Sequence, residues 1–554
     1  MRLSSLVALS FVGTMVLVGC GGGGGGSVGT DPVILPADID VNVTITDEYQ
    51  VESLGTAKTI NASVSIEGIA KSLYLVLSNS ATTSASSTIT HNAKVAPEAQ
   101  SKTVLPASLS SKPVIIRTPQ YVQDFSSQVG TLLSKEETTQ LQAKTIDIAE
   151  RMEDNVDDTD SFCTNINQVT YTCTESTNAT ARKIVSGIST DLGLKTLNIW
   201  VSNDSFDSGS GCSKARCVTQ TMVDALADNF LLSGTDNDIY DWVTNIYGEE
   251  WEADTNGIIG LIPKNDEITI LLTDIDEDNS ANGGVVGFFW SKDNFLSTII
   301  PGSNERVMFY IDSVMFANSD DGWDIDDAWP KELVSTLAHE FQHMINFYQK
   351  NILLDADTDT WINEMLSEST EDIIATKIGH SVEGRYPLFN ENNTLSLTSW
   401  NSQLEDYSKV NVFGAYLLRN YGGAKLLHDI MHTSYEDERA VVNAVNKSPE
   451  GLGKTFPDLL SEWGVAVMLS DHDNLVDTPV YNIGTLFENV YGSTMYEMSS
   501  INLFSYDPPP RTYSTSGTVQ AQGNYYYHIG DNLTGDINIT LELNGQTEAT
   551  LIAK

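Results

Sequence analysis

Two histidines and a glutamate share one pentapeptide, His339-Glu340-Phe341-Gln342-His343. Apolar residues recur at helical spacing on both sides of it, so we expect a helix here. On that helix His339 and His343 lie ~6 Å apart along the axis and on one face, where two imidazoles can share a tetrahedral zinc ion. Glu340 then lies beside the open position of the metal, where it can take a proton from water. The alternative is a helix with two histidines in a polar stripe and no metal.

A zinc site needs a third protein ligand, and a second helix is predicted to begin near Thr360. The loop between the two helices allows an antiparallel pair, which returns a carboxylate to the histidine face. We therefore assign Glu364 as the third ligand. Glu368 lies one turn further on the same face and is a candidate to accept an N–H from a ligating histidine. The alternative for each glutamate is a solvated helix acid.

The segments His339–Lys350 and Thr360–Asp372 resemble the hyicolysin family of zinc metallopeptidases, and a weaker similarity runs from Ile268 to Trp463. That family belongs to the broader thermolysin-like group, which uses two histidines and a glutamate. The resemblance implies a thermolysin-like domain that hydrolyses protein or peptide substrates. It implies His339, His343 and Glu364 as zinc ligands and Glu340 as the catalytic base. Met365 is a departure, because such enzymes commonly have a small residue there, and it puts the closeness of the helix packing in question.

A zinc peptidase also benefits from a donor that stabilises the tetrahedral oxyanion. The segment Tyr407-Ser408-Lys409, before an apolar helix, looks like the tyrosine-bearing segment of zinc aminopeptidases and their relatives. Tyr407 is therefore our candidate donor, and the alternative is a tyrosine that only packs its ring. His428 and His432 are also four residues apart, but no glutamate lies between them in the required place. We interpret that second pair as incidental.

Upstream of the motif, the acidic stretch Asp274–Asp278 follows an apolar strand. Alternating acids can gather oxygen ligands around Ca²⁺, but the spacing lacks parts of the EF-hand pattern. We therefore favour an acidic hairpin loop and keep calcium as the alternative. After it, Val285–Trp290 is predicted to be an edge strand, to which an extended peptide could add by backbone hydrogen bonds.

The rest of the 554-residue chain must position this site. Apolar strands are predicted first and helices dominate after Pro330, and this order of elements predicts an α+β fold. We expect a peptidase domain flanked by N-terminal and C-terminal β domains. A Ser/Thr-rich stretch, Ser78–Thr90, predicts a loop, and a capping box at Ser134 predicts a helix to about Met152. The predicted boundaries are 1–19 (signal peptide), 20–37 (lipidated cysteine and glycine-rich tether), 38–115 (N-terminal β domain), 116–161 (helical connector), 162–474 (metallopeptidase domain) and 475–554 (C-terminal β-sandwich-like module).

The N-terminus predicts export. A short apolar stretch after Arg2 ends in Gly19-Cys20, which resembles the lipobox of bacterial lipoproteins. In those proteins the chain is cleaved between the two residues and the cysteine is lipidated. We expect membrane contact through a lipid on Cys20, at the outer membrane or cell surface; the alternative is an ordinary secretory signal. Four cysteines remain, and of three possible connectivities we expect the local one, Cys163–Cys173 with Cys212–Cys217.

The charge balance narrows the possible partners. Lys plus Arg is 30 and Asp plus Glu is 75, so the net charge of −45 argues against nucleic-acid partners. We expect a zinc-dependent endopeptidase that acts on extracellular or periplasmic proteins, and two other functions stay open at this point. One is an aminopeptidase, although no Gly-x-Met-Glu-Asn segment is present to hold a free amine. The other is a surface binding protein or adhesin with a structural zinc site.

Overall fold

The computed structural model describes residues 38–93, 115–116, 118–133, 153–232, 238–252, 258, 260–264, 266–319, 322–472, 485–488 and 495–554. The predicted signal peptide, the tether with Cys20 and the helix expected over Ser134–Met152 lie outside these residues. None of the helices in the described part of the chain has both the length and the hydropathy to cross a bilayer.

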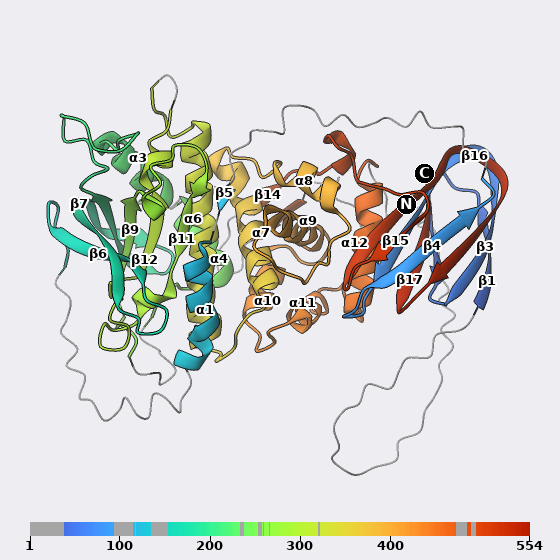
Figure 1. Ribbon diagram of the computed structural model, residues 1–554, viewed down its shortest axis with the longest axis horizontal. Helices are drawn as coiled ribbons and strands as arrows, with labels where there is room; N and C mark the ends of the chain where they lie inside the picture. The colour runs from blue at the N-terminus through green and yellow to red at the C-terminus, as the bar shows by residue number, and fades with distance from the viewer. Residues whose placement is uncertain are drawn as a thin grey trace, which may run out of the picture. The chain divides into compact units, whose positions relative to one another are not determined.

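A six-stranded mixed sheet lies beside the helices that carry the site (Figure 1). Its strands, in spatial order, are β11 (Gly287–Phe289), β12 (Met308–Asp312), β9 (Glu267–Thr273), β8 (Gly193–Ser202), β7 (Cys173–Thr190) and β6 (Thr159–Ile166). The strands β12, β9 and β8 are parallel, and their largely apolar runs are buried, as expected of parallel strands covered on both faces. Thr269 in β9 and Asn198 in β8 are buried polar residues inside these runs. β11 runs antiparallel at the edge. The edge strand predicted over Val285–Trp290 is confirmed over Gly287–Phe289, whereas Val285 belongs to β10 (Gly284–Val285), which pairs with β5 (Ile115–Ile116).

The helices that the structure describes are α1 (Gln120–Leu132), α3 (Gln220–Phe230), α4 (Asp238–Tyr247), α5 (Ser313–Phe316), α6 (Ala328–Asn346), α7 (Thr360–Ile378), α8 (Arg385–Asn392), α9 (Leu404–Asn420), α10 (Ala424–Met431), α11 (Glu438–Val445) and α12 (Phe456–Leu469). Most helices follow the six-stranded sheet along the chain, as predicted, but α1 precedes it and α3 and α4 lie between β8 and β9, so the structure is a mixed α/β protein. α6 packs on β11 and β12, and α7 packs between α6 and α9. The apolar face of α6, including Leu333, Leu337 and Phe341, is buried, which fixes the histidine-bearing helix against the sheet.

Strands from the two ends of the chain form one sheet (Figure 1, blue and red). They are β1 (Asp38–Ile45), β2 (Gln50–Gly55), β3 (Thr59–Asn79), β4 (Ala85–His91), β15 (Ser516–Val519), β16 (Gly523–Leu543) and β17 (Thr547–Ala553). β3 and β16 pair along most of their length, with Ile60 opposite Leu541. These strands were predicted to form two separate β domains, but they lie in a single sheet. Alternating residues identify a strand, but they do not identify a partner that is hundreds of residues away.

The predicted loop Ser78–Thr90 is confirmed only over residues 80–84, because β3 runs to Asn79 and β4 begins at Ala85. Ala85, Ser87 and Ile89 alternate toward the interior while their neighbours are exposed. β4 pairs with β15 on one side and β16 on the other. The small and β-branched side chains therefore follow the period of a strand, although their composition is typical of a loop.

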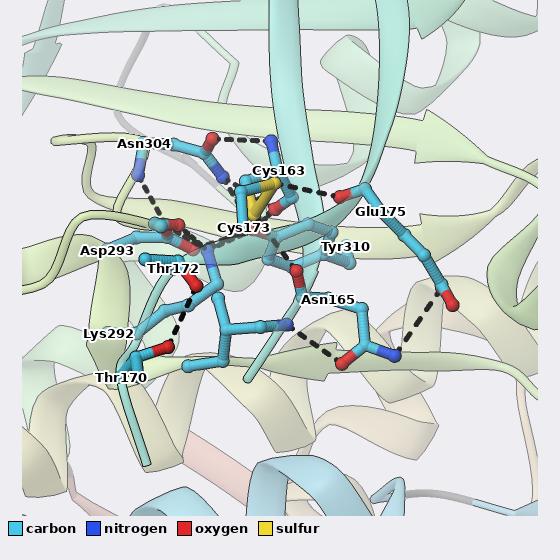
Figure 2. Close-up of a disulfide and its surroundings, with 12 residues drawn as sticks. Cys163, Asn165, Thr170, Thr172, Cys173, Glu175, Lys292, Asp293, Asn304 and Tyr310 are labelled. Atoms are coloured by element: carbon cyan, nitrogen blue, oxygen red, sulfur yellow. Dashed lines mark hydrogen bonds and ion pairs between the residues drawn. A yellow bond between two sulfur atoms is a disulfide. The ribbon is translucent and has the colours of Figure 1, made fainter. Parts of the chain in front are cut away.

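Both predicted disulfides are confirmed: Cys163–Cys173 and Cys212–Cys217 each have Cα atoms 5.7 Å apart. Figure 2 shows a buried polar network beside the first of them. The ammonium group of Lys292 lies 2.5 Å from Asp293 Oδ1, and the Tyr310 hydroxyl donates to Asp293 Oδ2 at 2.7 Å. Lys292 also donates to the carbonyl of Cys163 at 3.3 Å. This network ties the β6–β7 hairpin to the chain just after β11.

Candidate metal centre

Helices α6 and α7 bring the three predicted ligands together. His339 Nε2 lies 3.1 Å from Glu364 Oε2, and His343 Nε2 lies 3.5 Å from the same oxygen. Tetrahedral zinc with bonds of about 2.0–2.1 Å separates neighbouring donor atoms by roughly 3.3 Å. Two imidazole nitrogens and one carboxylate oxygen at this spacing therefore fit a zinc ion.

The electrostatics of the three side chains favour a positive charge between them. Burial opposes protonation of His339, but hydrogen bonds with Glu364 and Glu371 raise its pKa to about 10. Burial alone would raise the pKa of Glu364, yet His343 and His339 lower it to about 2. These shifts favour a positive charge between the three side chains, which a divalent cation would supply.

Glu340 lies where a base is needed. Its side chain is buried, and Oε2 accepts a hydrogen bond from the backbone N–H of Phe289 at 2.8 Å. Its other oxygen, Oε1, has no hydrogen-bond partner among the residues that the structure describes. Burial raises the pKa of the Glu340 carboxyl. The carboxylate is thus anchored to the edge strand through one oxygen and leaves the other for a reacting group.

The predicted role of Glu368 needs correction. Its Oε1 lies 3.9 Å from His339 Nδ1, beyond hydrogen-bond distance, whereas Oε1 of Glu371 lies 2.9 Å from that nitrogen. Sequence reasoning missed Glu371, although it lies seven residues after Glu364 and so shares its helix face. The side chain of Glu368 turns instead to Arg385, at 2.8 Å.

Tyr407 lies within the first turns of α9 rather than before the helix. The centre of its ring is 6.3 Å from that of His339 and 4.9 Å from that of Trp400, and the side chain is buried. The tyrosine is therefore next to the centre and is also packed, and its role as oxyanion donor stays a prediction.

The question raised by Met365 has a structural answer. Met365 is fully buried on α7 and faces Gly414 of α9. A Cβ atom at position 414 would collide with the hydroxyl of Ser369. The room for close helix packing thus comes from a glycine on α9, and the larger residue on α7 is accommodated.

A cleft opens over the ligands. Its lining includes Phe289 of β11, Glu340 and His343 of α6, Glu364 of α7, and Gln123 of α1. α1, which lies within the predicted helical connector 116–161, forms the facing wall, a role that was not predicted for it. Gln123 accepts a hydrogen bond from the hydroxyl of Ser402 at 2.8 Å, which links α1 to the loop before α9.

The acidic stretch Asp274–Asp278 is paired with the side chain of a lysine from another part of the chain. The ammonium group of Lys214 lies 2.7 Å from Asp274 and 2.9 Å from Asp204. Asp274 also accepts the backbone N–H of Asn279, as expected for a tight acidic loop. Lys214 supplies the positive charge that calcium would bring, in accord with the hairpin-loop interpretation.

The second histidine pair differs from the first. The rings of His428 and His432 stack with centres 4.0 Å apart. Burial and the neighbouring His432 lower the pKa of His428 to about 4. The described residues contain no group of three metal-binding side chains that includes either of them.

The chain is similar to known metallopeptidases. The family model described as Peptidase M30 matches residues 177–476, a range that contains all three predicted ligands. Neutral metalloprotease ShpI of Staphylococcus hyicus is 26% identical over 261 residues, which cover 46% of this chain and 52% of that protein. The chain thus spans about half the length of this curated relative. The crystal structure of a two-domain M1 zinc metallopeptidase bound to L-tryptophan matches 54% of this chain and 53% of its own, at 11% identity and a TM-score of 0.29.

Proposed function

The chain belongs to the Peptidase M30 family, and from that premise we propose that it is a zinc-dependent endopeptidase with a thermolysin-like arrangement of its site. One observation carries the proposal. Glu340 is anchored to Phe289 of the edge strand through one oxygen, and its other oxygen is left without a partner beside His339, His343 and Glu364. A structural metal site has no need of such a base.

His339, His343 and Glu364 would hold the zinc ion. When bound, zinc polarises a carbonyl oxygen and lowers the pKa of water to about 7. Glu340 takes a proton from the attacking water and delivers it to the leaving amine. The buried environment that raises its pKa makes the carboxyl group a stronger base and suits it to both transfers. Tyr407 is the candidate to stabilise the oxyanion.

The substrate is an extended peptide added at the edge of β11. The Phe289 N–H faces this edge, but Glu340 accepts it, so it is not available to the substrate. The Gly287 backbone, two residues earlier, faces the same edge because strand residues alternate with period 2. Backbone pairing there would hold many sequences in one orientation, as expected of an enzyme that reads chain shape.

Digestion of an unbiased peptide library, with and without a chelator, tests the proposal by mass spectrometry. An endopeptidase cleaves N-terminally blocked peptides at internal bonds, and the chelator abolishes cleavage. Cleavage of unblocked peptides alone would identify an aminopeptidase instead. Bound zinc without any cleavage would favour a binding protein or adhesin with a structural metal.

We also propose that the protein is exported and anchored through a lipid on Cys20. The two disulfides support export, because disulfides persist in oxidising compartments. The Cys20→Ser variant should move from the membrane fraction to the soluble fraction of cells. Wild-type protein that is already soluble would contradict the anchor.

A further inference from the structure

Two buried carboxylates lie on the side of His339 away from Glu364. Glu371 Oε1 is 2.9 Å from His339 Nδ1, and Glu368 Oε1 is 3.9 Å from it. All three side chains are fully buried. Glu364, Glu368 and Glu371 follow one another at helical spacing, so a single face of α7 supplies both the ligand and the groups behind the histidine.

An arginine distinguishes these two carboxylates. Arg385, the first residue of α8, donates from Nε to Glu368 Oε2 at 2.8 Å and from Nη2 to Glu368 Oε1 at 3.0 Å. The same Nη2 donates to Glu371 Oε2 at 2.9 Å. Both oxygens of Glu368 are therefore engaged by the guanidinium group, whereas Glu371 keeps Oε1 for His339.

We propose that Glu371, held in place by Arg385, is the positioning residue for His339, and that Glu368 anchors the arginine. This inference rests on the proposed zinc site. A carboxylate at Nδ1 favours the proton on that nitrogen, so that Nε2 can present its lone pair to a bound metal ion. It also fixes the ring plane and raises the basicity of the ligand.

Arg385 also disfavours a second metal ion between His339, Glu368 and Glu371. His339, Glu368 and Glu371 place one donor atom each within 4.8 Å of one another, as metal ligands would. The guanidinium group of Arg385 already neutralises one of the two negative charges there. The remaining net charge of −1 stabilises the positive charge on the other side of the imidazole ring.

Zinc affinity of the metal-free full-length protein tests the assignment, measured by competition with a chromogenic chelator. We expect Glu371→Ala to weaken zinc binding by about 10- to 100-fold, and Glu368→Ala to weaken it less. Asp372→Ala is the matched control. Asp372 lies on the same helix, and its carboxylate pairs with Arg419 at 3.3 Å in a largely buried ion pair.

The thermal midpoint of each metal-free variant separates positioning from general destabilisation. A Glu371→Ala variant as stable as the control but weaker in zinc binding supports the proposal. Equal zinc affinity of Glu371→Ala and Asp372→Ala would overturn it, as would a larger loss in Glu368→Ala. If the alanine variants do not fold, Glu371→Gln is expected to lose more affinity than Glu368→Gln, and the reverse order overturns the assignment.

The result is distinguishable from failure of the proposed function. If the wild-type protein binds no zinc, the zinc peptidase itself is refuted. If the wild type binds zinc and cleaves peptides while Glu371 variants match the control, only the positioning role is refuted.

Discussion

Two pairs of histidines in this protein share the same helical spacing but have opposite chemistry. His339 and His343 lie on α6 with their ring centres 4.9 Å apart, and His428 and His432 have theirs 4.0 Å apart at the end of α10. The pKa of His339 is raised to about 10, because hydrogen bonds with Glu364 and Glu371 outweigh its burial. The pKa of His428 is lowered to about 4 by burial and by His432.

The difference lies in the carboxylates around each pair. Glu364 faces both rings of the first pair, and Glu371 lies behind one of them. At the second pair, Asp429 also pairs with Lys425 and Lys447, at 2.7 and 3.1 Å, which offset its charge. Spacing alone thus permits two imidazoles to share an ion, and the charge of the neighbouring carboxylates that remains after their own ion pairs decides whether an ion is favoured there.

The largest effect is expected when one histidine of the first pair is removed. His343→Ala should lose both stoichiometric zinc and peptidase activity, because two remaining ligands cannot hold the ion in a closed site. Metal analysis of the purified protein together with a peptide assay checks this. His432→Ala is the matched control and should keep both. Stoichiometric zinc in a folded His343→Ala protein would refute the ligand set.

The next largest effect is expected for a substitution that removes the catalytic base but leaves the metal ligands in place. Glu340→Gln should retain zinc and lose about 10²- to 10⁴-fold in kcat, the range for removal of a general acid–base group. The amide oxygen can still accept the N–H of Phe289, so the edge strand should keep its place. Unchanged turnover in this variant would contradict the assignment of Glu340.

Local features of the site could be predicted from the sequence. The HExxH helix and the helix beginning at Thr360 are short-range patterns, and their spacing placed His339, His343 and Glu364 together. Glu371 was missed because the choice between it and Glu368 depends on Arg385, which comes from the following helix. Similarly, the pairing of β3 with β16 joins the two ends of the chain, and no local pattern contains it.

The smallest expected effect concerns stability at mildly acidic pH and tests the second pair. An unfolded histidine has a pKa near 6.5, whereas the pKa of His428 in the folded protein is about 4. Between these values the unfolded state binds more protons, so the free energy of unfolding rises with pH and is lost as the pH falls from about 6.5 to about 4. A shift of this size corresponds to about 3 kcal/mol for a fully buried group, and solvent screening at this partly exposed ring makes the effect smaller. The His428→Gln variant removes the titrating group, so urea unfolding of the variant should show a shallower pH dependence than the wild type in this window. Parallel curves for the two proteins would mean that the histidine pair is not held neutral, and the contrast between the two pairs would fail.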